Sequence, residues 1–236
     1  MDRIITKNKL AANTLKLWLL TEGAIYNGFG KLLELTSDLY ATEKIDNASL
    51  VVKNKQSGEE LLYILAGRQI VSSDKLEVCA LATDFNMPDR ELNTQDTIRK
   101  VQENGAVAAL NWAPGKWFLK RGKIVQNIIE TNNPKELLLS ETTMRPTIWP
   151  TPALVKQAFS NNFRMVVGSD PLPFSGEEEL IGSYASLMQG DFDPKAPAES
   201  VRNLLLDPAV SITRLGKRSG PVTFAKRQYK IMNYNK

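Results

Sequence analysis

Four polar residues recur at nearly constant intervals through the middle of the sequence. Asp84, Asn111, Glu141 and Asp170 stand at or near the ends of the short apolar runs "ALATD", "AALNW", "LLLSE" and "VVGSD", at intervals of 27, 30 and 29 residues. A strand with its crossover helix takes about 30 residues. The spacing therefore predicts that all four residues lie at the carboxyl ends of successive parallel strands, where α/β proteins bind ligands.

Three carboxylates and an amide at one edge would suit a hard cation such as Mg²⁺, Mn²⁺ or Ca²⁺. We therefore predict Asp84, Glu141 and Asp170 as candidate metal ligands, with Asp170 as the candidate catalytic carboxylate. The alternative is that each residue has a local role. Asp and Asn at strand ends often form Asx turns or cap the next helix, and Glu141 is close enough in sequence to pair with Arg145.

A cationic segment follows the strand that contains Asn111. The stretch "NWAPGKWFLKRGK" places lysines and an arginine in a loop and in the first turns of an expected amphipathic helix. Free amides at a helix start, with cations nearby, can hold phosphate or carboxylate. The candidate anion-binding residues are Asn111, Lys116, Lys120, Arg121 and Arg145. The alternative is a solvated basic helix face.

The composition excludes several chemistries. The chain has no histidine and one cysteine, Cys79. An imidazole general base, a Ser-His-Asp triad, a His-ligated zinc and a cysteine-rich metal site are therefore all ruled out. Any catalysis must use carboxylates, lysine, tyrosine or a carboxylate-bound metal. Cys79 lies in the apolar run "LEVCALATD" and is predicted to be a small buried residue.

The length and composition of the chain are typical of a soluble globular protein. The chain has 236 residues, of which 42% are hydrophobic and 24% charged. No apolar run approaches about 18 residues, so no membrane partner is expected. The start "MDRIITKNKL" has no apolar core of a secretory signal, so we expect a cytoplasmic protein.

The net charge of +4 is concentrated towards the C-terminus. No acidic residue follows Asp207, and residues 215–236 form a basic tail. Such a tail can bind polyanions, or it can serve only to keep the chain soluble. The sequence contains no helix-turn-helix, zinc finger or aromatic single-strand motif, so nucleic acid is not the expected partner.

Periodicity predicts the elements that would position these residues. Residues 1–45 are expected to form a helical segment, followed by short strands from about residue 48. Helices and strands then alternate, with Asn93 or Thr94 as a helix cap and a helix expected over "EEELIGSYASLM". Ser175 and Glu178 match a capping box, which would leave the glutamate run capping and solvated.

Apolar strands that alternate with amphipathic helices predict a parallel sheet buried on both faces. A phosphate-binding glycine loop is lacking, which disfavours a doubly wound nucleotide-binding fold. We therefore predict a single α/β domain over residues 1–236, built as a parallel (β/α) barrel.

Three stretches also resemble uncharacterised proteins of the polymerase and histidinol phosphatase (PHP) superfamily. They are "LNWAPGKWFLKRGKIV", "LLLSETTMRPTIWPTPALVKQA" and "VVGSDPLPFSGEEELIGSYASLMQG", within residues 60–215. The resemblance implies a distorted seven-stranded TIM-like barrel and, in active members, a metal-dependent phosphoesterase. Gly168-Ser169-Asp170 is similar to the late strand-end motif whose Asp binds metal. The His-x-His strand and late Asp-x-His of active members are absent.

The expected function is therefore that of a degenerate PHP-like protein. It would bind an anionic small molecule, bearing phosphate or carboxylate, or a partner at the carboxyl edge of the strands, without histidine-dependent metal catalysis. The first alternative is a phosphoric ester hydrolase that uses Mg²⁺ or Mn²⁺ held by carboxylates alone. The second is a polyanion-binding protein that acts through its basic tail.

Overall fold

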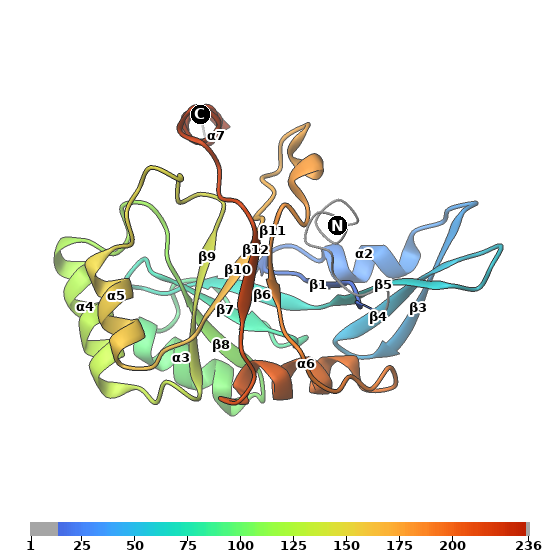
Figure 1. Cartoon of the computed structure of the whole chain (residues 1–236), viewed down its shortest axis with the longest axis horizontal. Helices are drawn as coiled ribbons and strands as arrows, with labels where there is room; N and C mark the ends of the chain where they lie inside the picture. The colour runs from blue at the N-terminus through green and yellow to red at the C-terminus, as the bar shows by residue number, and fades with distance from the viewer. Residues whose placement is uncertain (1–13, 235–236) are drawn as a thin grey trace.

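The computed structural model describes residues 14–234 and shows a multi-sheet α/β fold (Figure 1). Over these residues the chain forms sheets of four, six and two strands, together with six α-helices. Residues 14–234 contain no helix that is long and apolar enough to cross a bilayer.

The six-stranded sheet is mixed and carries the strand ends of interest. Its order is β10 (Met165–Gly168), β9 (Leu137–Thr142), β8 (Val107–Asn111), β7 (Glu77–Leu81), β6 (Gly67–Val71) and β2 (Glu22–Gly23). The strands β8, β9 and β10 are parallel, whereas β7 is antiparallel to both of its neighbours. The predicted strand runs in this region are confirmed.

A four-stranded sheet packs beside it. Its order is β1 (Leu17–Leu19), β5 (Glu60–Leu65), β4 (Ser49–Asn54) and β3 (Tyr40–Asp46). The strands β3, β4 and β5 form an antiparallel meander. Because only Ala66 separates β5 from β6, the chain passes directly from this sheet into the six-stranded one.

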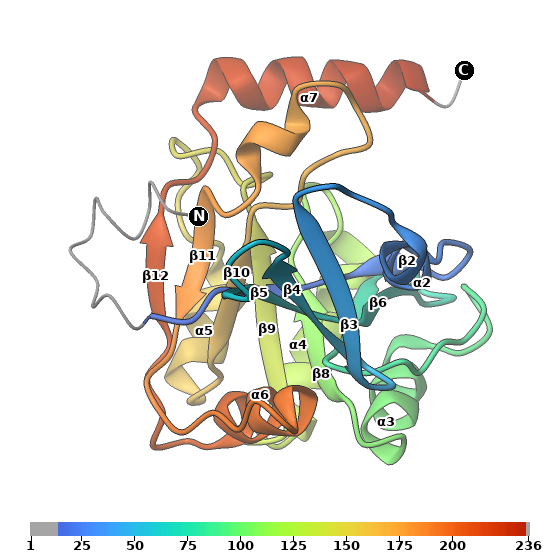
Figure 2. The same cartoon turned by 90° about the vertical axis from the view of Figure 1, so that its right-hand side faces the viewer.

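A two-stranded ribbon lies along the edge strand β10. It consists of β11 (Tyr184–Leu187) and the antiparallel β12 (Thr213–Gly216). The backbone N–H of Val167 donates to Ser186 Oγ over 2.8 Å, which ties β10 to this ribbon. Figures 1 and 2 show β10, β11 and β12 side by side.

Helices cover both faces of the six-stranded sheet. On one face lie α3 (Thr94–Glu103), α4 (Leu119–Thr131) and α5 (Ala153–Ser160). On the other face lie α6 (Pro197–Leu206) and the four-stranded sheet. Leu137 and Leu139 pack on the first face and Leu138 on the second, as expected for a strand buried on both sides. Cys79 is buried, as predicted.

Two further helices lie near the ends of the described chain. The short α2 (Gly28–Glu34) follows β2, and α7 (Pro221–Tyr234) crosses the end of the molecule above β9 and β10 (Figures 1 and 2). Pro221 opens α7, at a position where the missing N–H of proline costs no helical hydrogen bond. Asn93 also caps α3 as predicted, because its side chain accepts the N–H of Asp96.

The predicted single parallel (β/α) barrel, the seven-stranded TIM-like form included, is wrong. Over residues 14–234 the six-stranded sheet stays open, with β10 and β2 at its edges. The cause is the hairpin in which β6 and β7 pair antiparallel across the short turn 72–76. A buried antiparallel strand has the same apolar composition as a buried parallel one, so the run "LEVCALA" could not reveal its direction.

Two predicted helical segments also differ from the structure. Residues 14–45 of the expected helical start contain the strands β1 and β2, the start of β3 and only the short α2, and residues 1–13 lie outside the described chain. The helix expected over "EEELIGSYASLM" divides into the 3₁₀ turn η1 (Glu177–Leu180) and β11. Gly182, with φ of +72°, separates the two elements in a conformation that a helix does not allow.

Gly67 should be essential to the junction between the two larger sheets. A Cβ there would strike the Leu20 carbonyl oxygen and lie 2.7 Å from the Ala80 carbonyl oxygen. We expect Gly67→Ala to lower the free energy of unfolding by about 2 kcal/mol, measured by urea denaturation. Gly168→Ala is the matched strand control, because nothing lies within 4 Å of its added Cβ. Equal stabilities of the two variants would contradict this prediction.

Candidate functional site

Because β7 runs antiparallel to β8, Asp84 does not lie at the expected site. In the pairing of β7 with β8, Glu77 lies opposite Asn111 and Leu81 lies opposite Val107. The carboxyl end of β7 is therefore at the sheet edge remote from the carboxyl ends of β8 and β9. Asp84, which follows β7, is exposed there. Glu77 occupies the position beside Asn111 that the sequence assigned to Asp84.

Side-chain alternation then separates Asn111 from Glu141. Ser140 Oγ donates to Asn111 Oδ1 over 3.0 Å, and both lie on the sheet face that packs Leu138. Glu141 is the next residue along β9 and points to the opposite face, which packs Leu139. The carboxyl ends of β8 and β9 therefore direct polar side chains to both faces of the sheet.

The first group, here called the arginine cluster, consists of Glu141, Arg145, Tyr184, Arg214 and Arg218. Glu141 is 1% exposed and accepts two hydrogen bonds from Arg145, from Nε at 2.6 Å and from Nη2 at 3.0 Å. Tyr184 Oη donates to the same carboxylate over 2.7 Å. The pairing of Glu141 with Arg145 that the sequence left open is thus present, and it is buried.

The electrostatics of Glu141 favour its charged form. Burial alone would raise the pKa of its carboxyl, but the hydrogen bonds from Arg145 and Tyr184 and the charges of Arg145 and Arg214 outweigh burial and lower that pKa. Glu141 is therefore a fixed anion that orients the guanidinium of Arg145.

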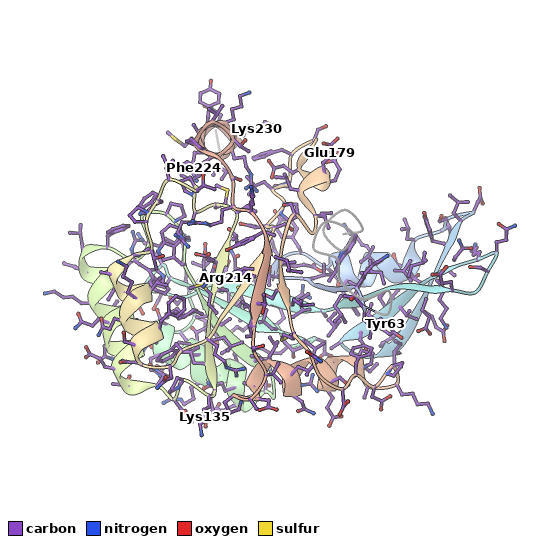
Figure 3. All side chains as sticks on the ribbon, in the orientation of Figure 1. Tyr63, Lys135, Glu179, Arg214, Phe224 and Lys230 are labelled. Carbon is purple, nitrogen blue, oxygen red and sulfur yellow. The ribbon has the colours of Figure 1, made fainter. Side chains whose placement is uncertain are left out.

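Arg214 and Arg218 give the cluster an excess of positive charge. Arg214 Nη1 lies 3.8 Å from Glu141 Oε1, and its side chain is 38% exposed. Arg218 Nη1 donates to the Trp149 carbonyl over 3.4 Å. Burial, and then the charge of nearby Arg145, lowers the pKa of Arg218. Three guanidiniums thus surround one carboxylate. Figure 3 labels Arg214 on β12.

The second group lies on the other face of the sheet, and its polar side chains bind one another. Glu77 is held by Lys116 Nζ at one carboxylate oxygen and by Asn111 Nδ2, at 2.9 Å, at the other. Asn111 and Lys116, two predicted anion ligands, are therefore engaged by Glu77. The sequence interpretation missed Glu77 because it stands at the start of its strand, and only the antiparallel pairing brings it to this edge.

The other two predicted anion-binding residues, Lys120 and Arg121, lie at the start of α4. Lys120 is exposed in the first turn of α4, and Arg121 Nη2 donates to the Gly115 carbonyl over 2.8 Å. Lys120 and Arg121 are therefore not part of the arginine cluster. Of the five predicted anion-binding residues, Arg145 is the one that the structure places in the arginine cluster.

Asp170 lies just after β10, with an unusual backbone conformation. Its φ is +49°, a left-handed conformation that Asp and Asn adopt more readily than most residues. Burial raises the pKa of its carboxyl, which the Thr142 hydrogen bond and the Arg227 charge only partly offset. The catalytic role of Asp170 and the alternative local role as an Asx turn or helix cap both stay predictions.

Arg227 anchors α7 to the same edge. It is 2% exposed and pairs with Glu177, with Nη2 2.8 Å from Oε2. It also donates to Thr143 Oγ1 over 2.7 Å and to the Asp170 carbonyl over 2.6 Å. The interpretation of the glutamate run as capping and solvated is therefore wrong for Glu177. Gly176, with φ of +88°, precedes η1 in place of the predicted cap Ser175.

The predicted metal ligands are not brought together. Within residues 14–234 no three His, Cys, Asp or Glu side chains gather in a way that could hold a metal ion. Asp84 lies at the remote edge, and Glu141 is bound by Arg145 and Tyr184. The structure therefore gives no support to a shared site of Asp84, Glu141 and Asp170 for Mg²⁺ or Mn²⁺.

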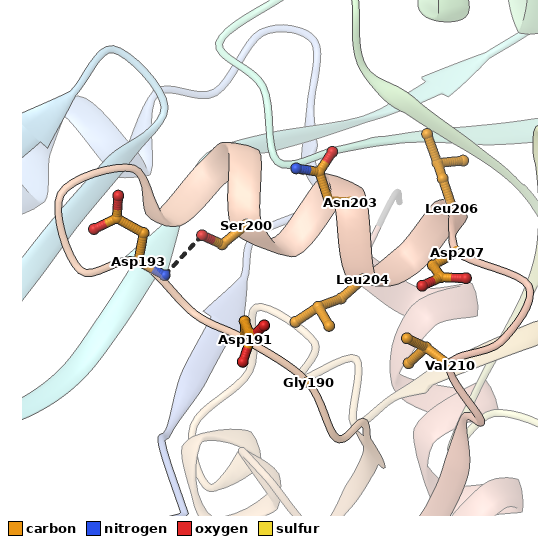
Figure 4. Close-up of a pocket in the computed structure, with 9 residues that line it drawn as sticks. All are labelled: Gly190, Asp191, Asp193, Ser200, Asn203, Leu204, Leu206, Asp207 and Val210. Carbon is orange, nitrogen blue, oxygen red and sulfur yellow. Dashed lines mark hydrogen bonds between the residues drawn. The ribbon is translucent and has the colours of Figure 1, made fainter.

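A surface hollow lies elsewhere, between α6 and the preceding segment (Figure 4). Three aspartates line it, but two of them make local turns: Asp193 Oδ1 accepts the Lys195 N–H, and Asp207 Oδ1 accepts the Ala209 N–H. Figure 4 also shows the 2.9 Å bond from the Asp193 N–H to Ser200 Oγ. These side chains stabilise the helix ends and do not define a site.

Fold and site together define a class: a mixed multi-sheet α/β protein with a cationic cluster at the carboxyl ends of its parallel strands. No family model matches the chain, and no curated protein matches it in sequence. A solved structure, the crystal structure of PsfC from Pseudomonas syringae PB-5123, is similar with a TM-score of 0.55 at 11% identity. The match covers 97% of this chain and 87% of PsfC. At this identity the likeness concerns the fold alone.

Removal of the Glu141 charge should strongly destabilise the protein. We expect Glu141→Gln to lower the free energy of unfolding at pH 7 by about 3 kcal/mol or more, because Arg145 would be left buried and unpaired. The pKa of Glu141 is lowered, so its contribution is present at neutral pH and lost as the pH falls through that pKa. Urea denaturation at several pH values measures both effects.

The matched control is Glu43→Gln, which breaks an ion pair with Lys53 in which Glu43 is 63% exposed. We expect a change within about 0.5 kcal/mol. A Glu141→Gln loss as small as that of the control would contradict the importance of the buried pair.

Asp170→Asn should stabilise the protein at neutral pH. A raised pKa means that folding costs free energy once Asp170 must ionise, so the wild type loses stability as the pH rises from the unfolded-state pKa to the raised one. Asn removes that cost and tolerates the positive φ. The variant should be more stable than the wild type at pH 7 and equal at about pH 3, by urea denaturation. A less stable variant at pH 7 would show that the carboxylate is needed as a charge.

Proposed function

We propose that this protein binds a small anionic molecule, bearing phosphate or carboxylate, at the arginine cluster. The observation that supports the proposal is the charge balance: Arg145, Arg214 and Arg218 surround the single carboxylate of Glu141. Such an excess of guanidinium groups is stabilised by an anion, and the planar guanidinium forms paired hydrogen bonds with phosphate or carboxylate oxygens.

The cluster has a rigid and an accessible part. Arg145 is 3% exposed and is held by Glu141 and by the Trp149 carbonyl, at 3.1 Å. Arg214 and Arg218 are partly exposed, so both can donate to a ligand from solvent. The buried pair keeps the surrounding chain in place, which lowers the conformational cost of binding.

The two alternatives have weaker support. A phosphoesterase with carboxylate-bound Mg²⁺ or Mn²⁺ would need ligands that the described residues do not bring together. A polyanion-binding tail would act through α7, where Lys226 and Lys230 are exposed but Arg227 is buried against Glu177. The PHP relationship and a cytoplasmic location stay proposals of the sequence.

Titration calorimetry with inorganic phosphate tests the proposal. We expect saturable binding that weakens about tenfold or more in Arg214→Gln and in Arg218→Gln, since each loses a charged hydrogen-bond donor. The control is Arg99→Gln on α3, where the arginine is 64% exposed in a surface ion pair. Binding that is absent, or equal in all four proteins, would contradict the proposed function.

A further inference from the structure

Trp149 supports the arginine cluster through its backbone and packs against other aromatic side chains. The Trp149 carbonyl accepts hydrogen bonds from both Arg145 and Arg218. Its indole ring contacts the ring of Phe118, with centroids 6.5 Å apart, and that of Trp112, with centroids 5.7 Å apart. Trp149 therefore joins the cationic groups to an aromatic group.

Several of these apolar residues are exposed. Phe118 is 46% exposed and Ile148, next to Trp149 in the chain, is 72% exposed. Leu119 is 90% exposed and has φ of +53°, which is strained for a residue with a bulky side chain. Two exposed apolar residues are thus linked to Trp149, Phe118 by ring contact and Ile148 by sequence, and the Trp149 carbonyl binds two of the guanidiniums.

Arg214 makes a second aromatic contact in the cluster. The guanidinium of Arg214 stands over the Phe159 ring, 5.5 Å from its centroid, and Phe159 is 38% exposed. In addition, Trp112 Nε1 is buried and has no acceptor in the described part of the chain. Unpaired buried donors are rare, and this one belongs to the ring that packs on Trp149.

We propose that the ligand is an amphiphilic anion. Its phosphate or carboxylate is bound by Arg214 and Arg218, and its aromatic or aliphatic group packs on Trp149, Phe118 and Ile148. This inference rests on the proposed function and specifies its ligand class. A purely inorganic anion would leave the apolar side chains in water, whereas a neutral apolar ligand would leave the excess positive charge uncompensated. One molecule that carries both parts satisfies both surfaces.

The test compares two probes of like charge, inorganic phosphate and phenyl phosphate, by titration calorimetry at about pH 8, where both are mostly dianions. We expect phenyl phosphate to bind about tenfold more tightly, because its ring leaves water against an apolar surface. The double variant Phe118→Ser/Ile148→Ser should bind phenyl phosphate no more tightly than phosphate, with phosphate affinity unchanged. Both side chains are exposed, so the variant should fold.

The controls separate the two proposals. Val222→Ser, which changes a 68% exposed apolar residue on α7, should alter neither affinity. Arg214→Gln should weaken both probes. If phosphate binds and phenyl phosphate binds no more tightly, or if its advantage survives in the Phe118→Ser/Ile148→Ser variant, the amphiphilic ligand is wrong and the anion site stands. If phosphate does not bind, the proposed function fails, whether or not phenyl phosphate binds.

Discussion

The buried ion pair between Glu141 and Arg145 is the interaction on which the candidate site depends. Both side chains are almost completely removed from solvent, at 1% and 3% exposure. Neither charge can be left alone there without a large loss of stability. Because Tyr184 on β11 donates to the same carboxylate, and Arg214 on β12 stands close to it, the pair joins the end of β9 to the edge ribbon.

This pair also sets the charge balance of the arginine cluster. Glu141 compensates one positive charge, so the second and third arginines are left with a net attraction for anions. Arg145 positions the Trp149 backbone, and the Trp149 ring in turn meets Phe118 and Trp112. The arrangement places a cationic surface and an apolar surface side by side, which is the basis of both proposals.

A second buried ion pair, between Arg227 and Glu177, holds α7 in place. Arg227, paired with Glu177, ties α7 to the Asp170 carbonyl and to Thr143. The Glu77 group closes the other sheet face with Lys116 and Asn111. The carboxylates in these groups have cationic partners, so the edge gathers ion pairs where the sequence suggested a metal.

The sequence by itself determined the local elements and the chemistry that is excluded. Periodicity and capping predicted the strand runs around Leu138 and Val167 and the Asn93 cap, and the absence of histidine rules out imidazole chemistry. Only the tertiary structure decided which residues meet. An apolar run does not encode the direction of its strand, so Asp84 was placed at the wrong edge and Glu77 was missed. Regular spacing likewise ignores side-chain alternation, which sends Ser140 and Glu141 to opposite faces. Arg214 and Arg218 lie far along the chain from Glu141, and no local pattern links them before β12 packs against the sheet.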